Sequence, residues 1–182
     1  ADGRLLYRHG DPIAADSVRC CGRIESEDFV HWSDPELIIA PGEWTCQGDS
    51  FYGITIIPYE GEYLGLLQVF HRYAPNFGYL EEQLVISSDS RRWRPAGDSM
   101  FLTAGEPGEW DCGSVGAAPR VLVRDQDILF YYSGTPRSHG GGTLATLPEG
   151  GLGLASLRRD GFAYLRPPWQ EGILTLQPFT SQ

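Results

Sequence analysis

Two stretches of this chain follow the same plan, and a repeated plan constrains the fold more than any single motif does. Gly42 to Val69 begins with a Gly-Glu-Trp segment and continues as an aromatic, β-branched strand, a glycine turn and a second strand. Gly105 to Gly134 contains the same Gly-Glu-Trp segment, then a run of small residues and an aromatic strand at Ile128 to Tyr132. Short strands that recur every 60 to 70 residues, roughly, predict a stack of similar sheets.

A polar turn also recurs along the chain. The segments Ser26 to Trp32 and Ser87 to Trp93 share the spacing Ser-x-Asp-x-x-x-Trp, and Arg158 to Phe162 repeats the turn around Asp160 with Phe in place of Trp. Aspartates in such turns usually accept hydrogen bonds from local backbone amides. No helical periodicity of useful length is present. We therefore predict an all-β protein with antiparallel sheets, at least about nine strands and no helix longer than about two turns.

The charge balance excludes several classes of function. The formal net charge is −10, and the chain has no lysine, so every basic side chain is an arginine. Nucleic acids and anionic membranes bind basic surfaces, and we expect neither as a partner. The absence of lysine removes Schiff-base chemistry and the phosphate-loop lysine.

The cysteines and histidines show no metal-binding pattern. Cys20, Cys21, Cys46 and Cys112 lack paired metal-ligand spacing, and two adjacent cysteines are not typical of a disulfide framework. His139 has no second ligand at the spacing that zinc or haem requires. We predict free thiols, no metal and no cofactor.

Taken together, these segments resemble a known family. The chain is similar to five-bladed β-propeller proteins of glycoside hydrolase families 32, 43 and 130, and nearest to uncharacterised family 32-like bacterial proteins. The resemblance lies in five segments: RIESEDFVHWSDPELIIAP, GDSFYGITIIPYEGEYLGLLQVFH, SSDSRRWRP, GEWDCGSVGAAPRVLVRDQDILFYYSG and GLASLRRDGFAYL. It implies part of a five-bladed β-propeller, about three blades, with antiparallel sheets.

The same resemblance implies a division of the chain. An incomplete propeller spans 1–171, with blade repeats near 1–41, 42–104 and 105–171, and 172–182 is a linker or the start of a C-terminal β-sandwich. Open sheet edges are prone to further strand pairing. We therefore expect either a homo-oligomer or a part of a longer chain.

The family's chemistry implies a funnel in which acidic residues of successive blades meet a sugar. Hydrolysis of a glycosidic bond needs one ionised and one protonated carboxyl group. Family 32 carries Trp-Glu-Cys-Pro around its acid, whereas this chain has Trp44-Thr45-Cys46 and Trp110-Asp111-Cys112, and the blade that supplies the family's first aspartate is absent. Asp49 and Asp111 each precede a candidate inner strand and are our candidate catalytic residues.

Each candidate has a simpler interpretation. Asp49 and Asp111 could be turn aspartates that bind backbone amides. Tyr52, His71 and Trp110 are predicted to contact carbohydrate, and the alternatives are packing for the two aromatic side chains and a solvated loop for His71. Two functions remain open at this point. One is a glycoside hydrolase, and the other is a non-catalytic carbohydrate-binding or assembly module.

Overall fold

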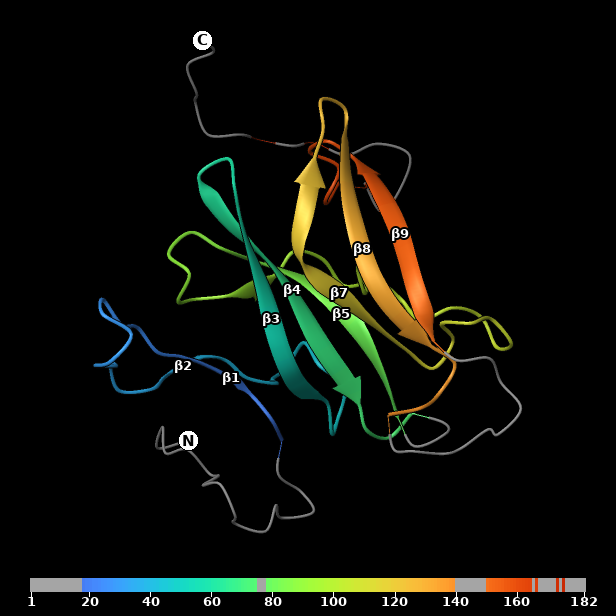
Figure 1. Ribbon diagram of the computed structural model, residues 1–182, viewed down its shortest axis with the longest axis horizontal. Helices are drawn as coiled ribbons and strands as arrows, with labels where there is room; N and C mark the ends of the chain where they lie inside the picture. The colour runs from blue at the N-terminus through green and yellow to red at the C-terminus, as the bar shows by residue number, and fades with distance from the viewer. Residues whose placement is uncertain are drawn as a thin grey trace.

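The computed structural model describes residues 18–74, 78–139 and 150–164, together with Arg166, Ile173 and Thr175. These residues form strands and turns and contain no helix (Figure 1). No helix in this part of the chain is long and apolar enough to cross a membrane. The strands are β1 (Cys21–Arg23), β2 (Glu36–Ile39), β3 (Ser50–Tyr59), β4 (Glu62–His71), β5 (Tyr79–Ser87), β6 (Arg94–Pro95), β7 (Ser114–Val123), β8 (Asp127–Thr135) and β9 (Gly151–Arg158). The all-β prediction is confirmed.

The strands form two sheets. Strands β1 and β2 pair with each other, and the larger sheet has the order β3-β4-β5-β7-β8-β9, with β6 paired to β5. Every strand pair is antiparallel except β5 with β7, which meet in parallel at Leu80 and Ser114. The predicted antiparallel character therefore holds, with one parallel joint between two antiparallel groups of strands.

The pairing fixes which ends of the strands lie together. Because β3 and β5 are each antiparallel to β4, and β5 is parallel to β7, the strands β3, β5 and β7 all run in one direction. We call the end at which these three strands begin the entry end. Strands β4 and β8 finish there, and their arrowheads point to it in the lower part of Figure 1.

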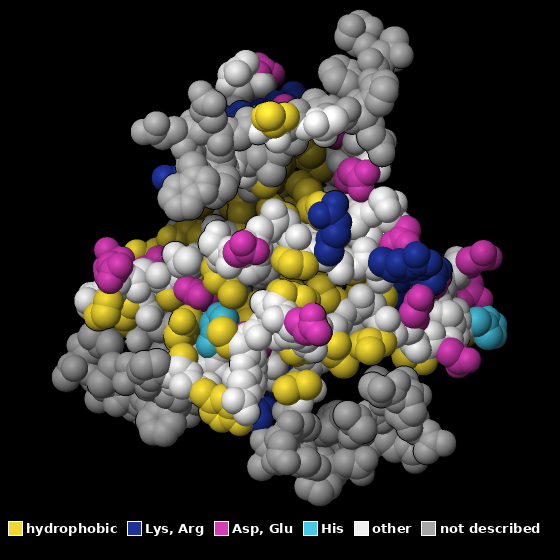
Figure 2. Space-filling view, turned by 180° about the vertical axis from the view of Figure 1, so that it is seen from behind, with side chains coloured by type: hydrophobic (Ala, Val, Ile, Leu, Met, Phe, Trp, Pro, Cys, Tyr) yellow, Lys and Arg dark blue, Asp and Glu magenta, His cyan; other side chains and the backbone are white. Residues whose placement is uncertain are grey.

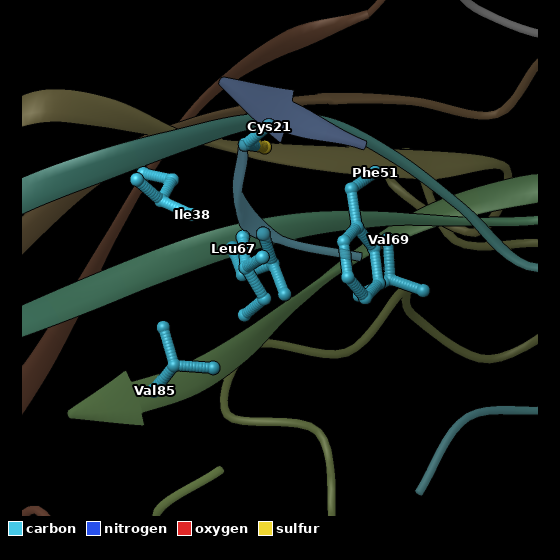
Figure 3. Close-up of a cluster of buried hydrophobic side chains, with 7 residues drawn as sticks. Cys21, Ile38, Phe51, Leu67, Val69 and Val85 are labelled. Carbon is cyan, nitrogen blue, oxygen red and sulfur yellow. The ribbon is translucent and has the colours of Figure 1, made fainter. Parts of the chain in front are cut away.

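The first hydrophobic core lies between the β1–β2 pair and one face of the β3–β5 strands (Figure 3). Phe51, Leu67, Val69 and Val85 alternate along their strands, so that they all point to this face, and each is at most 2% exposed. Burial of such side chains stabilises the fold by roughly 1.5–3 kcal/mol each. The core is completed by Cys21, Ile38 and Ile39, with Ile54 and Trp93 at its margin.

The second core lies on the opposite face of the same strands. Residues of β3, β4 and β5 meet residues of β8 there, with Ala117, Val121, Ala155 and Leu157 packed around them. The buried members of this core are Ile57, Leu64, Leu66, Leu84, Ile128 and Phe130. The strands β3–β5 therefore have a covered face on each side, and three groups of strands pack in series.

The same joint connects each group of strands to the next. The Arg19 backbone N–H donates to Ser50 Oγ at 3.2 Å, and the Leu80 backbone N–H donates to Ser114 Oγ at 3.2 Å. Ser50 and Ser114 are the first residues of β3 and β7. The two joints are structurally equivalent, which supports the internal repeat inferred from the sequence.

The predicted aspartate turns are present at Asp28 and Asp89. Asp28 Oδ1 accepts the amides of Val30 and His31, and Asp89 Oδ1 accepts those of Arg91 and Arg92, all at 2.8 Å. The backbone hydrogen bonds lower the pKa of Asp89 to about 2.

The turn at Asp160 is different. Asp160 itself adopts a φ of 61°, and its carboxylate accepts the hydroxyl proton of Tyr59. The Asp160 carboxylate therefore connects two strand groups, whereas those of Asp28 and Asp89 bind within their own turns.

Two strands are longer in the structure than the sequence pattern predicts, and two predicted segments lie largely outside the described residues. The polar segment from His71 to Gly78 predicts a loop, and the apolar run Leu84 to Ile86 predicts a short strand. In the structure, His71 is the last residue of β4, and β5 already begins at Tyr79. The glycines between Ser133 and Gly151 predict a loop, and most of this stretch and of the 172–182 segment lies outside the described residues.

Candidate functional site

Asp49 and Asp111, the two candidate catalytic aspartates, both lie at the entry end. Asp49 directly precedes β3, and Asp111 lies in the turn before β7. Only 2% of Asp49 and 8% of Asp111 is exposed. Buried carboxylates need specific partners, because an unpaired charge in the interior is strongly unfavourable.

Asp49 belongs to a three-residue cluster with His71 and Glu81. Its Oδ1 atom accepts a hydrogen bond from His71 Nδ1 at 3.0 Å, and its Oδ2 atom accepts the backbone amide of Cys46 at 2.9 Å. His71 Nε2 lies 3.5 Å from Glu81 Oε2, a separation too long for a good hydrogen bond but short enough for charge attraction. Glu81 Oε1 accepts the Ala104 amide at 2.9 Å. The His71 ring thus lies between two carboxylates.

The cluster changes the titration of His71. Burial lowers the pKa of the imidazole, but the neighbouring carboxylates of Glu81 and Asp49 outweigh this effect, so the pKa is raised overall. The centroids of the Tyr79 and His71 rings lie 5.0 Å apart, and burial raises the pKa of the Tyr79 hydroxyl, because burial disfavours its charged form. His71 is therefore protonated over a wider pH range than a solvated histidine.

Asp111 has a different set of partners. Its Oδ2 atom accepts the Tyr132 hydroxyl at 3.0 Å. Its Oδ1 atom and Glu109 Oε2 both lie within 3 Å of the point that a Cβ on Gly105 would occupy, so these two oxygens are less than about 6 Å apart. Glu109 Oε2 also accepts the Glu106 amide at 2.9 Å, and Glu109 is exposed. A buried and an exposed carboxylate thus lie close together.

Gly105 leaves the space that these two carboxylates fill. We expect Gly105→Ala to lower the free energy of unfolding by about 1–2 kcal/mol, because the added methyl group displaces Asp111 or Glu109. The measurement is chemical denaturation. Gly42→Ala is the matched control, because nothing lies within 4 Å of its Cβ position, and it should change stability little. Equal effects of the two substitutions would contradict the packing described for Asp111.

The backbone segment Ala104-Gly105 connects the Asp49–His71–Glu81 cluster to the loop that holds Asp111. Ala104 donates its amide to Glu81, and the next residue, Gly105, donates its amide to the Asp111 backbone carbonyl at 3.4 Å. The contacts therefore run from Asp49 through His71 and Glu81 to the loop that holds Asp111.

The other predicted contact residues are packed against the protein. The guanidinium carbon of Arg19 lies 4.3 Å from the ring centroid of Tyr52, and the rings of Phe70 and His139 contact Tyr52 edge-on. Trp110 stacks on Tyr132 with ring centroids 5.7 Å apart. Tyr52 and Trp110 are thus both half-buried and packed against other side chains, and Trp110 directly precedes Asp111 in the chain.

Two acidic residues of β5 were not predicted as site residues. Glu81 completes the cluster around His71, and Glu82 points to the other face, where its Oε1 atom accepts the Ala117 amide at 2.9 Å. Glu82 Oε2 has no hydrogen-bond partner among the described atoms, and burial raises the pKa of Glu82 to about 7. The available signal was the sequence Glu81-Glu82-Gln83 between Leu80 and Leu84, since three polar residues inside a buried strand indicate a special role.

No metal site accompanies these acids in the described part of the chain. Among those side chains, no group of three or more His, Cys, Asp and Glu residues is arranged to hold a metal ion. In the view of Figure 2, acidic and hydrophobic side chains are intermixed over the surface.

Comparison with known proteins identifies a shared fold. No protein-family model matches the sequence, and no curated protein matches it. A solved structure described as "Glycoside hydrolase" matches with a TM-score of 0.53 and 15% identity over 83% of this chain. A structure of a complex of BT0996 with RGII matches with a TM-score of 0.49 and 19% identity over 66% of this chain. The chain spans 39% and 35% of these two proteins, respectively. It is thus similar in fold to part of a glycoside hydrolase.

Proposed function

We propose that this protein is a carbohydrate-active protein that hydrolyses O-glycosidic bonds with Asp49 and Asp111. The observation that carries the proposal is the placement of two nearly buried carboxylates at the entry end, one ahead of β3 and one ahead of β7. The two acids come from the loops that precede β3 and β7. Glycosidic hydrolysis requires such a pair, one on each side of the scissile bond.

The partners of the two acids suit different roles. Both oxygens of Asp49 accept hydrogen bonds, which leaves this carboxylate as an acceptor that stabilises positive charge on the sugar ring. Asp111 has one oxygen on the Tyr132 hydroxyl and the other near Glu109. We assign proton donation to Asp111, because it accepts one side-chain hydrogen bond from the protein, whereas both oxygens of Asp49 are already engaged.

The proposed architecture is an incomplete five-bladed β-propeller, in which each group of strands is a blade. Three features support it: the groups pack in series, the serine joint recurs, and the aspartate turns follow the third strand of successive groups. In this architecture, β3 and β7 are inner strands. The proposed association with another copy or with further sequence follows from the open sheet edges.

The alternative is a module that binds carbohydrate without cleaving it. The burial of Asp49 and its hydrogen bond to His71 favour this alternative, since they limit direct access to the carboxylate. Trp110, beside Asp111, is the aromatic side chain placed to stack on a sugar in either case.

Hydrolysis and binding are separated by one comparison. The intact chain and the double variant D49N/D111N are assayed for release of the aryl group from a panel of neutral aryl glycosides, and calorimetry measures the binding of the matching sugars. We expect turnover to fall at least about 100-fold while binding is retained. Binding without turnover in the unsubstituted chain supports the alternative. The absence of both rejects the proposal, and turnover that survives in the double variant removes these aspartates from it.

A further inference from the structure

His71 contacts two carboxylates that come from different segments of the chain, Asp49 and Glu81. It is the last residue of β4, and its ring bridges the segment before β3 and the strand β5. Each carboxylate that it contacts holds one loop through a backbone amide. Asp49 accepts the amide of Cys46, and Glu81 accepts the amide of Ala104.

These two amides belong to the two loops that carry the proposed catalytic acids. Cys46 lies in the loop that ends at Asp49. Ala104 is followed by Gly105, which packs against the side chain of Asp111 and donates to its backbone carbonyl. Apart from the joints between strands, the Asp49–His71–Glu81 cluster is thus a side-chain connection between the two loops.

We propose that His71 is a positioning residue whose imidazolium holds the loop before β3 and the loop before β7 in a fixed relation, and so sets the separation of the Asp49 and Asp111 carboxylates. This inference rests on the proposed function in one respect: the separation of the two carboxylates matters for catalysis only if both are catalytic. The contacts themselves are independent of any substrate.

The charges around His71 determine how the device responds to pH. The groups that face it are Asp49 from the loop before β3, and Glu81 and Tyr79 from β5, with the Cys46 thiol in electrostatic contact with Tyr79. With His71 protonated, one positive charge lies between two carboxylates. When His71 loses its proton, two largely buried negative charges remain and repel each other. The contact between the loops therefore weakens as the pH rises through the pKa of His71.

Amide hydrogen exchange tests the proposal in the full chain without any substrate. The ring protons of His71 report its titration by NMR, and the Cys46 and Ala104 amides report the two loops. We expect the protection factors of both amides to fall by about tenfold or more as His71 deprotonates, because each amide is held by a carboxylate that depends on the imidazolium. The Leu80 amide is the internal control, because it binds the Ser114 hydroxyl and should keep its protection.

Two variants complete the design. In His71→Gln, the protection of the Cys46 and Ala104 amides should no longer depend on pH, because glutamine does not titrate. His31→Gln is the matched control, since His31 contacts Asp28 at 2.7 Å in an exposed turn and should leave both amides unchanged. Constant protection of both amides through the His71 titration of the unsubstituted chain overturns the proposal, and this measurement needs no variant to fold.

Activity provides a separate readout. If the chain hydrolyses glycosides, its kcat/KM should fall on the alkaline side with the pKa of His71, and His71→Gln should remove that limb of the profile. If the chain is inactive but the protection of the Cys46 and Ala104 amides falls as His71 deprotonates, the catalytic proposal is rejected and the positioning role stands. An active chain in which the protection of the Cys46 and Ala104 amides stays constant through the His71 titration rejects the positioning role alone.

Discussion

Asp111→Asn is expected to reduce hydrolysis of the best aryl glycoside by about 100-fold to 10,000-fold, the range typical of a lost general acid. Asparagine has nearly the same shape as aspartate and can still accept the Tyr132 hydroxyl proton, so the fold should persist. We expect the free energy of unfolding to change by about 1 kcal/mol. The measurements are kcat, KM and the melting temperature of both proteins at one pH.

The control for this prediction comes from the aspartate turns. Asp89→Asn makes the same chemical change at a carboxylate that binds only within its own turn. Asp89 follows the last residue of β5, and β5 begins at the entry end, so Asp89 lies at the other end of this strand. The substitution should lower the melting temperature slightly and leave turnover unchanged. Equal rates for Asp111→Asn and the unsubstituted protein, combined with a lower melting point, would show that Asp111 is a structural turn residue.

Glu82→Gln is expected to stabilise the protein at pH 8 by up to about 3 kcal/mol. The pKa of Glu82 rises from 4.5 to about 7 on folding, and each tenfold change in proton affinity corresponds to about 1.4 kcal/mol. The ionised side chain is buried with one oxygen lacking a partner among the described atoms. Glutamine removes the charge and can still accept the Ala117 amide.

The raised pKa of Glu82 also determines how the stability of the unsubstituted protein changes with pH. Between pH 4.5 and about 7, the unfolded chain releases the Glu82 proton while the folded chain retains it, so the stability of the unsubstituted protein falls as the pH rises. The difference between the two proteins should be largest above pH 7 and absent near pH 4. His71 is present in both and cancels. Chemical denaturation at several pH values measures the effect, with the exposed Glu62→Gln as control. A variant that is less stable at pH 8 would show that the ionised Glu82 has a partner.

Much of the fold followed from periodicity, and the errors have physical causes. The strands and the first two aspartate turns were predictable because their patterns are local. A proline inside an apolar run predicts the end of a strand, yet Pro58 lies inside β3, paired with Tyr63 of β4. Because β3 is the edge strand of its sheet, the missing N–H of proline removes no ladder bond on the open side.

The site was predictable only in part. Asp49, Asp111 and His71 were identified as polar residues beside strands, and they lie at the entry end. Their partners were not identified, because the hydrogen bond of Asp49 to His71 and that of Asp111 to Tyr132 each join residues about 20 positions apart. Local sequence specifies a turn or a strand, but it does not specify which distant side chain completes a carboxylate.

The recurrence of one serine joint has a consequence for the history of the chain. Ser50 and Ser114 make the same bond to the strand group before them, at the same distance. A unit that carries its own connector can be duplicated without a new interface having to evolve, because the copy already matches the end to which it is added. The serine is then the part that both units share, while residues at equivalent distances from the joint differ, such as Cys21 of β1 and Glu82 of β5.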